Sequence, residues 1–193
     1  MDPLSALSGP DLAALVGSRL CHDLVSPVGA IGNGLELLQM VSEPSPELAL
    51  IADAVAAAQA RLRLFRLAFG AASADQEVRP ADLVESLAAL GGNSRIALAC
   101  DLARPLPRPE ARRLALAALC AETACARGGV IRIAPARVEA QGPRLTGDPA
   151  LWDSLARGLP PPDLAASSVH FALLAASGPV GVRAEEGRLT LTL

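Results

Sequence analysis

The sequence lacks several residue types that common functions require. It has no lysine and no tyrosine, and it contains one tryptophan and two histidines among 193 residues. The absence of lysine excludes a P-loop, whose lysine binds phosphates, and Schiff-base chemistry. The net charge is −3, whereas nucleic-acid-binding proteins usually carry clustered basic residues and aromatic side chains on which bases stack. The sequence therefore predicts no nucleic-acid partner.

Cysteine is also sparse. The four cysteines are Cys21, Cys100, Cys120 and Cys125. They form no C-x-x-C pair, and the spacing of the two histidines among them does not suit a zinc site. We expect buried or half-buried thiols in a reducing compartment and no bound metal.

Long uncharged apolar runs are absent as well. The longest candidate, residues 48–60, is interrupted by Asp53, and a membrane span needs about 18 uncharged apolar residues. The first twenty residues show no basic region followed by an apolar run, so no secretory signal is predicted. We expect a cytoplasmic protein with no membrane partner.

Helices dominate the first part of the chain. Small and branched aliphatic residues make up most of the 51% apolar content, which favours closely packed helices. Residues 11–41 form one predicted helix, with Pro10 and Asp11 at its start. Ser45 is a predicted cap for a second helix that runs to about Phe69 and ends at Gly70. The short loop between them predicts an antiparallel helical hairpin.

The remainder has a mixed pattern after a small, polar linker at residues 70–80. Predicted helices are 80–90, 109–127, 148–157 and 164–176. Predicted strands are 96–101, 130–133, 136–140, 144–146, 180–184 and 189–193, the last two forming a hairpin. Residues 104–110 are a predicted turn region and 159–163 a rigid turn. The predicted fold class is α+β.

The segment "HDLVSPVGAIGNG" (residues 22–34) admits two interpretations. As a phosphate-binding loop it fails, because its glycines have the reverse of the dinucleotide spacing and no lysine follows. As a helix, with about 100° per residue, it places Ser26, Gly29, Asn33, Glu36 and Met40 on the same face as His22. The apolar stripe lies on the opposite face and contains Leu20, Leu24, Val28, Ile31, Leu35 and Leu38. We expect that stripe to be buried and His22 to be exposed.

An exposed histidine on a helix suits nucleophilic chemistry. A neutral imidazole attacks phosphorus through Nε2, and a carboxylate that binds Nδ1–H fixes the tautomer. Asp23 is the candidate, although adjacent helical side chains diverge by about 100°. Pro27 either bends the helix or is a tolerated kink. Gly29 leaves bare backbone for an approaching protein, and the alternative explanation for the glycines is tight packing against a neighbouring helix.

The motif "HDLVSP" resembles the H-box of two-component histidine kinases, and "CHDLVSPVGAIGNGLELL" resembles the ChpT-like histidine phosphotransferases of alphaproteobacteria. The resemblance implies that His22 is the phosphoacceptor, Asp23 its acidic neighbour, Ser26 the polar residue one turn on, and Pro27 the kink. It also implies that residues 1–73 are a dimerisation and phosphoacceptor hairpin. Two such hairpins would form a four-helix bundle in a homodimer.

Residues 76–193 resemble a histidine-kinase ATP-binding domain that has degenerated. The segment "RRLALAALCAETACARGGVIRI" keeps the shape of the kinase helix that carries asparagine, but Cys120 stands where that asparagine would be. A D-x-G-x-G motif and a glycine-rich lid are absent. The resemblance therefore implies an α/β sandwich without a nucleotide.

The function implied is phosphoryl transfer through His22 between receiver-domain aspartates, from a hybrid sensor kinase to a response regulator, without ATP. No cofactor is expected on this chain, and Mg²⁺ is expected on the partner receiver. The predicted docking residues are Ser26, Pro27, Gly29, Ala30, Asn33, Leu37 and Met40. Alternatives are an ATP-dependent histidine kinase, a non-catalytic receiver-binding module and a metal-dependent hydrolase. Phosphatase activity at Ser26 stays open, and His170, on an apolar helix, is expected to be structural.

Overall fold

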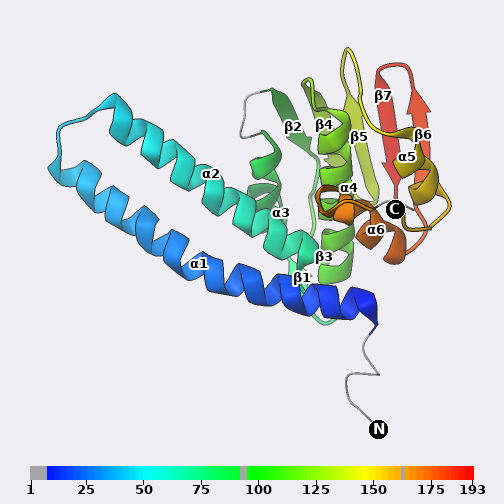
Figure 1. Cartoon of the computed structure of the whole chain (residues 1–193), viewed down its shortest axis with the longest axis horizontal. Helices are drawn as coiled ribbons and strands as arrows, with labels where there is room; N and C mark the ends of the chain where they lie inside the picture. The colour runs from blue at the N-terminus through cyan, green and yellow to red at the C-terminus, as the bar shows by residue number, and fades with distance from the viewer. Residues whose placement is uncertain (1–7, 92–94, 162–163) are drawn as a thin grey trace, which may run out of the picture. The chain divides into compact units, whose positions relative to one another are not determined.

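The computed structural model describes residues 8–91, 95–161 and 164–193. The chain divides into two compact units, Met1–Ala71 and Ala72–Leu193, and the division falls within the predicted linker. In the first unit, α1 (Gly9–Val41) and α2 (Pro46–Phe69) form an antiparallel hairpin (Figure 1). The hairpin confirms the prediction of two long helices joined by a short loop.

Local sequence signals set the ends of both helices. Ser8 caps α1, because its hydroxyl accepts a hydrogen bond from the Asp11 backbone N–H while the Asp11 carboxylate accepts one from the Ser8 N–H. The helix thus begins two residues before the predicted start. Ser45 caps α2 by accepting from the Leu48 N–H, and Gly70 ends that helix, both as predicted.

Small residues, not leucines, form the buried face of α1. Its buried residues are Ala14, Cys21 and Gly32. In contrast, Leu20 and Ile31 of the apolar stripe are 58% and 56% exposed. The expectation that this stripe is buried is wrong for the single chain. The physical reason is rotational: Cys21 lies about 100° around the helix from His22, whereas Leu20 and Leu24 lie about 160° from it on either side.

The two helices approach most closely at Gly17. A Cβ there would lie 2.7 Å from the Phe69 carbonyl oxygen, and the adjacent Ser18 hydroxyl accepts a hydrogen bond of 2.9 Å from the Ala71 N–H. We expect Gly17→Ala to lower the free energy of unfolding by about 1–3 kcal/mol, because backbone must shift to admit the methyl group. Urea unfolding followed by circular dichroism measures this change.

Gly34→Ala is the matched control on the same helix. No atom lies within 4 Å of a Cβ at Gly34. Its substitution should raise the free energy of unfolding by up to about 1 kcal/mol through helix propensity. Equal stabilities of the two alanine variants would contradict the close helix approach at Gly17.

The second unit is built on a five-stranded sheet with the order β2-β4-β5-β7-β6. The strands are β2 (Ile96–Cys100), β4 (Gly129–Ala134), β5 (Arg137–Gln141), β6 (Gly181–Glu185) and β7 (Arg188–Thr192). The β2–β4 pair is parallel and the others are antiparallel. The predicted C-terminal hairpin is confirmed as β6 and β7, which pair around the Glu186–Gly187 turn.

Helices cover one face of this sheet. They are α3 (Pro80–Leu87), α4 (Arg108–Ala124), α5 (Pro149–Ala156) and α6 (Val169–Ala176). The central helix, α4, contacts β4, β5, β7 and α6. Ile131, Ile133, Val138, Leu189 and Leu191 are the buried members of their alternating strands, and the residues between them are polar. Such alternation is typical of a sheet with one face on the core and one in solvent. The helices and the sheet confirm the mixed α+β class.

Three predicted segments differ from the structure. Residues 144–146 are not a strand, because they dock on the end of α4, where the Thr146 N–H donates to the Ala124 carbonyl. The predicted turn region at 104–110 contains β3 (Leu106–Pro107), which pairs with β1 (Glu77–Val78). The helix predicted at 164–176 begins as a 3₁₀ turn at Ala166–Ser168 and becomes α-helical at Val169. The predicted turn at 159–163 lies partly outside the described residues.

By length and composition alone, α1 could cross a membrane; among the described residues it is the one helix that could. The sequence analysis predicted no membrane-spanning segment at this helix. One such helix near the N-terminus is weak evidence of a span. The exposed face of α1 that contains His22 also includes Asp23, Ser26 and Asn33.

Candidate functional site

His22 lies near the middle of α1, and its side chain is 81% exposed. The helix continues through Pro27, Gly29, Gly32 and Gly34 without a break. The loop interpretation of this segment is therefore wrong, and the helical interpretation with an exposed histidine is confirmed. On the same side of the helix, Ser26, Ala30 and Asn33 are exposed, as are the larger side chains of Leu37 and Met40.

The side chains of Arg19, Asp23 and His22 form a hydrogen-bonded row on α1. Nδ1 of His22 is 3.1 Å from Oδ1 of Asp23, and Nε of Arg19 is 2.8 Å from Oδ2 of the same carboxylate. The hydrogen bond from His22 holds the pKa of the Asp23 carboxyl below its ordinary value. Desolvation opposes this effect, and the positive charge of Arg19 adds a lowering effect that is smaller than the desolvation. Asp23 is thus an ionised acceptor despite its oblique position on the helix.

The row determines which nitrogen of His22 can react. An ionised carboxylate only accepts hydrogen bonds, so the contact with Asp23 places the imidazole proton on Nδ1. The lone pair then lies on Nε2, the nitrogen that makes no contact with Asp23. A neutral, exposed Nε2 whose ring is oriented by a carboxylate is a suitable nucleophile for phosphorus.

A groove of about 340 Å³ runs between α1 and α2, and its α1 side begins one turn after His22. Its lining residues are Val25, Val28, Gly29, Gln59, Leu62, Arg63 and Arg66. The Gln59 side-chain amide donates to the Val28 carbonyl at 3.5 Å. Two arginines and one bare glycine therefore border an opening next to the exposed imidazole.

The three glycines of α1 near His22 have different roles. Gly32 is buried, and a Cβ there would meet the Gln59 amide and Val55, so the tight-packing explanation holds for this residue. Gly29 and Gly34 have no atom within 4 Å of a Cβ position. The tight-packing explanation therefore does not hold for Gly34, which makes no close approach. Gly29 keeps the open backbone predicted for it.

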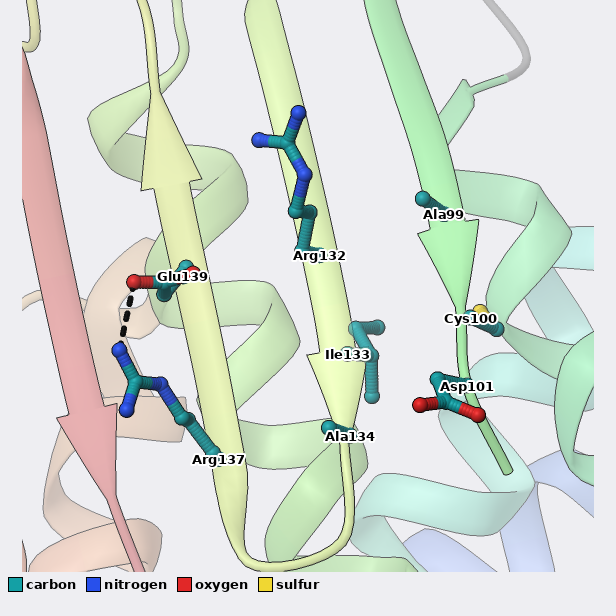
Figure 2. Close-up of a pocket in the computed structure, with 8 residues that line it drawn as sticks. All are labelled: Ala99, Cys100, Asp101, Arg132, Ile133, Ala134, Arg137 and Glu139. Atoms are coloured by element: carbon teal, nitrogen blue, oxygen red, sulfur yellow. Dashed lines mark hydrogen bonds and ion pairs between the residues drawn. The ribbon is translucent and has the colours of Figure 1, made fainter. Parts of the chain in front are cut away.

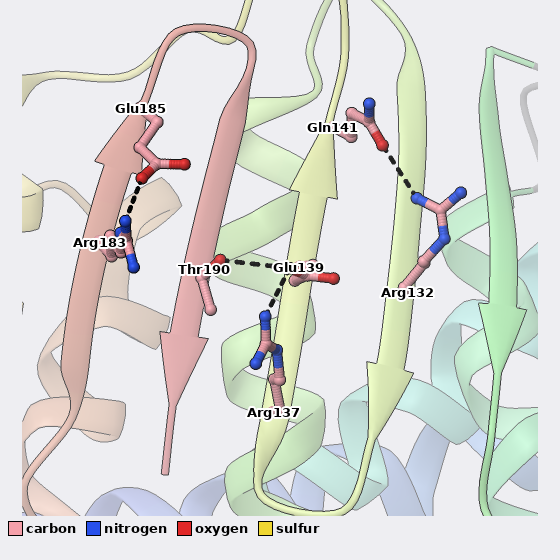
Figure 3. A network of polar contacts seen from close by, with 7 residues as sticks. All are labelled: Arg132, Arg137, Glu139, Gln141, Arg183, Glu185 and Thr190. Atoms are coloured by element: carbon pink, nitrogen blue, oxygen red, sulfur yellow. Dashed lines mark hydrogen bonds and ion pairs between the residues drawn. The ribbon is translucent and has the colours of Figure 1, made fainter.

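The polar face of the sheet carries a second group of charged residues. A hollow of about 300 Å³ is lined by residues that include Asp101, Arg132, Arg137 and Glu139. Figure 2 shows the side chains that line it. Figure 3 shows that these arginines have partners within the sheet: Arg137 donates to Glu139 at 2.7 Å, and Arg132 donates to Gln141 at 3.1 Å. The Arg132–Gln141 contact joins β4 to β5, and we interpret it as support for the sheet, because contacts between neighbouring strands on one face stabilise strand pairing. The Arg137–Glu139 contact lies within β5.

Two further contacts lie on the same face, one between β7 and β5 and one within β6. The Thr190 hydroxyl donates to Glu139 at 3.4 Å, and Arg183 lies 2.6 Å from Glu185 (Figure 3). The hydrogen bond from Arg137 holds the pKa of Glu139 below its ordinary value, with a smaller desolvation effect opposing it. Glu139 is therefore an ionised partner of arginine and does not have the raised pKa of a catalytic acid.

The helix α4 offers no polar site at the position of the expected asparagine. Cys120 is fully buried, and burial raises the pKa of its thiol well above the ordinary value. Its neighbours Ala117, Ala118 and Ala121 are also fully buried. His170 is buried on α6, where Nε2 is 3.3 Å from the Thr123 hydroxyl, which fits the expected structural role. Within residues 8–91, 95–161 and 164–193, no cluster of three potential metal ligands occurs.

The sequence interpretation missed the basic members of the site. Arg19 could have been found, because arginine four residues before an aspartate is a recognised helical ion-pair spacing. Gln59, Arg63 and Arg66 carried no such signal, because their relation to Gly29 depends on how α2 packs against α1. The site therefore extends beyond the predicted residues toward α1's N-terminus and onto α2.

The chain is similar to known proteins in sequence and in structure. Residues 80–178, about half of the chain, match the family model "Histidine phosphotransferase C-terminal domain". The chain is 39% identical over 129 residues to "Protein phosphotransferase ChpT" of Brucella abortus (strain 2308), and the match covers 66% of this chain and 62% of that protein's length. A bacterial phosphotransferase solved at 1.7 Å is similar over 96% of this chain and 97% of its own, with 29% identity and a TM-score of 0.63.

The chain belongs to the histidine phosphotransferase family. The residues that the family model matches, 80–178, lie within the second unit, and the structural similarity extends over both units. The resemblance that the motif around His22 suggested is thus confirmed at the level of the family.

Proposed function

We propose that the chain is a histidine phosphotransferase of a His-Asp phosphorelay, in which His22 carries the phosphoryl group between receiver domains. The observation that carries the proposal is the exposed imidazole whose Nδ1–H is bound by Asp23, which leaves Nε2 directed away from the carboxylate. The name of the relative in Brucella abortus and the family model support the same function.

The transfer step balances without any additional reagent. The Nε2 lone pair attacks the phosphorus of an aspartyl phosphate on the donor receiver, and the bond from phosphorus to the acyl oxygen breaks. The electron pair leaves with the donor carboxylate, and the imidazole becomes a positively charged N-phosphoryl ring. Asp23, which is hydrogen-bonded to Nδ1–H, stabilises that charge. The acceptor receiver reverses the step with its own aspartate.

Receiver docking on α1 follows from the exposed residues around His22. Ser26, Pro27, Ala30 and Asn33 are exposed, and Gly29 borders the groove toward Arg63 and Arg66 of α2. We propose this surface, extended by Leu37 and Met40, as the contact with a receiver on a hybrid sensor kinase and on a response regulator. The Mg²⁺ needed to neutralise the phosphoryl oxygens belongs to the receiver. Family resemblance suggests regulators of the cell cycle or of motility as recipients.

The exposed apolar stripe of α1 supports a homodimer. Leu20, Leu24, Ile31 and Leu38 are between 47% and 58% exposed and lie on the side of α1 opposite His22. On α2, Leu50 and Ile51 are also exposed. Contiguous apolar surface of this kind marks an interaction site. We propose that two hairpins pair through it into a four-helix bundle, which leaves both histidines in solvent.

We further propose that the second unit is a degenerate kinase ATP-binding domain and that transfer does not use ATP. The buried apolar environment of Cys120 supports this, because it offers no ligand for Mg²⁺ or phosphate where the kinase asparagine would be. An ATP-dependent kinase is the alternative, and ATP binding by the purified chain would favour it. We propose a cytoplasmic location, where receivers and their phosphodonors meet.

A transfer assay tests the proposal. The purified chain is incubated with a receiver domain that was phosphorylated with ³²P and then freed of its kinase and nucleotide. We expect label to move to the chain and then to a second receiver. The label on the chain should be stable to alkali and labile to acid, as a phosphoramidate is. Receiver binding without transfer would instead establish the non-catalytic binding module.

Gly29→Ala separates docking from helix stability. We expect this variant to be more stable by up to about 1 kcal/mol, because alanine favours a helix and no atom crowds the new methyl group. Transfer should nevertheless slow about tenfold, because a methyl group at a close-packed interface costs on the order of 1–3 kcal/mol. Gly34→Ala is the control, with the same gain in stability and unchanged transfer. A wild-type transfer rate for Gly29→Ala would remove this residue from the docking surface.

A further inference from the structure

We propose that Arg19 is a positioning residue for phosphoryl transfer, which holds the Asp23 carboxylate in the orientation that binds Nδ1–H of His22. The inference rests on the proposed function and adds a residue to it. Arg19 is one turn before Asp23 on α1 and binds Oδ2, while His22 is bound to Oδ1. Each oxygen of the carboxylate thus has its own partner.

The need for a third residue follows from helical geometry. Neighbouring side chains on a helix diverge by about 100°, so a carboxylate at position 23 does not face an imidazole at position 22 by default. The side chains of His22 and Asp23 are 81% and 47% exposed, so water competes with their contact. A residue four positions earlier lies on the same side of the helix as Asp23 and can reach it. Arg19 occupies that position and makes the shorter of the two contacts.

The directional hydrogen bonding of the guanidinium group supports this role of Arg19. Through Nε and a terminal nitrogen, a guanidinium can present donors in a fixed plane, whereas an ammonium group is a point charge without such a plane. Arg19 makes this contact through Nε, the guanidinium nitrogen that is bonded to the aliphatic part of the side chain. This geometry fixes the rotation of the carboxylate as well as its position. Lysine at position 19 would therefore retain the charge and lose most of the orientation.

If the Arg19–Asp23 ion pair served only to stabilise the helix, replacement of Arg19 would change the stability of the fold and not the reactivity of His22. A positioning role predicts the opposite. Exposed pairs of this spacing contribute little to folding, because solvent screens them and long side chains lose freedom when they pair. Replacement of Arg19 should thus leave thermal unfolding almost unchanged. Replacement of Arg19 should instead change which nitrogen of the His22 ring carries the proton. Without a fixed carboxylate, the imidazole populates the tautomer that is protonated on Nε2, and in this tautomer the lone pair lies on Nδ1, so Nε2 cannot attack.

The experiment compares four full-length variants with the wild type: Arg19→Gln, Arg19→Lys, Asp23→Asn and Arg183→Gln. Imidazole ¹⁵N chemical shifts report the tautomer of His22, and single-turnover transfer from a phosphorylated receiver reports the rate. We expect Arg19→Gln to increase the Nε2-protonated form and to slow transfer by about two- to fivefold, the range that suits a solvent-exposed pair. Arg19→Lys should recover part of both losses, and Asp23→Asn should show the larger effect.

Arg183→Gln is the charge-matched control, since Arg183 pairs with Glu185 on β6. It should match the wild type in tautomer and rate. Unchanged ¹⁵N shifts and rate in Arg19→Gln, with transfer by the wild type intact, would overturn the role of Arg19 and leave the proposed function standing. Absence of transfer by the wild type would overturn the proposed function itself. A slower rate with unchanged shifts would assign Arg19 to receiver docking and would also overturn the positioning role.

Discussion

His22→Gln is expected to reduce transfer of the phosphoryl group below detection. The amide has no nucleophilic nitrogen, and glutamine has the favourable helix propensity that keeps α1 intact. Since the side chain of His22 is 81% exposed, its replacement should leave stability near that of the wild type. Rapid-quench transfer from a ³²P-labelled receiver, with unfolding measured on the same preparation, provides both quantities.

His170→Gln is the control for His22→Gln, because it removes the chain's other histidine. His170 is buried beside Thr123 on α6 and lies in the second unit. It should lower stability while the remaining folded protein still accepts label. Label retained by His22→Gln at the wild-type level would end the proposal, since no other described residue has been assigned as acceptor.

A glutamate in the apolar stripe is expected to convert the proposed dimer to a monomer. Ile31 is 56% exposed in the single chain and lies on the side of α1 opposite His22. If the stripe is the core of a four-helix bundle, Ile31→Glu buries two carboxylates near the two-fold axis, which costs several kcal/mol per charge unless they are neutralised. We expect the dissociation constant to rise at least 100-fold, measured by sedimentation equilibrium.

Leu37→Glu is the matched control for oligomeric state. Leu37 is 64% exposed but lies about 60° around the helix from His22, on the docking side. It should leave the dimer intact. A wild-type chain that sediments as a monomer, or an Ile31→Glu variant that dimerises as tightly as the wild type, would contradict the bundle.

The parts of the fold that were predictable from sequence are those set by local chemistry. Ser45 with Pro46, and Gly70 at the other end, marked α2 to the residue. The alternation in residues 189–193 marked β7 because buried and solvent-facing side chains alternate along it. Each of these signals operates within a few residues of chain, so no knowledge of tertiary contacts was required.

The parts that were missed depend on contacts between distant residues. The hairpin interface could not be found from hydrophobicity, because Gly17 and Gly32 make its close approaches and the leucines lie elsewhere. The β1–β3 pair joins two-residue strands that are too short to show a period. The pattern of residues 144–146 predicts a strand, but the backbone N–H of Thr146 donates a hydrogen bond to the end of α4.

The candidate site follows the same division. The exposure of His22 was predictable, because a helical wheel separates it from the apolar stripe. Helical geometry alone predicts an oblique contact between His22 and Asp23. The sequence analysis did not predict the contribution of Arg19, which binds the second oxygen of the Asp23 carboxylate. The groove beside Gly29 required the packing of α2, which supplies Gln59 and two arginines.

The placement of separate surfaces around one rod restricts how α1 can evolve. Gly32 faces α2, Ile31 faces away from His22, and Asn33 shares the His22 side, so three consecutive residues belong to three surfaces. Point substitutions can alter one surface at a time. Insertion of a single residue anywhere between His22 and Ile31 would instead rotate everything beyond it by about 100°, bringing isoleucine to where glycine is needed against α2 and glycine to where asparagine lies on the His22 side. We therefore expect length in this segment to be conserved more strictly than identity.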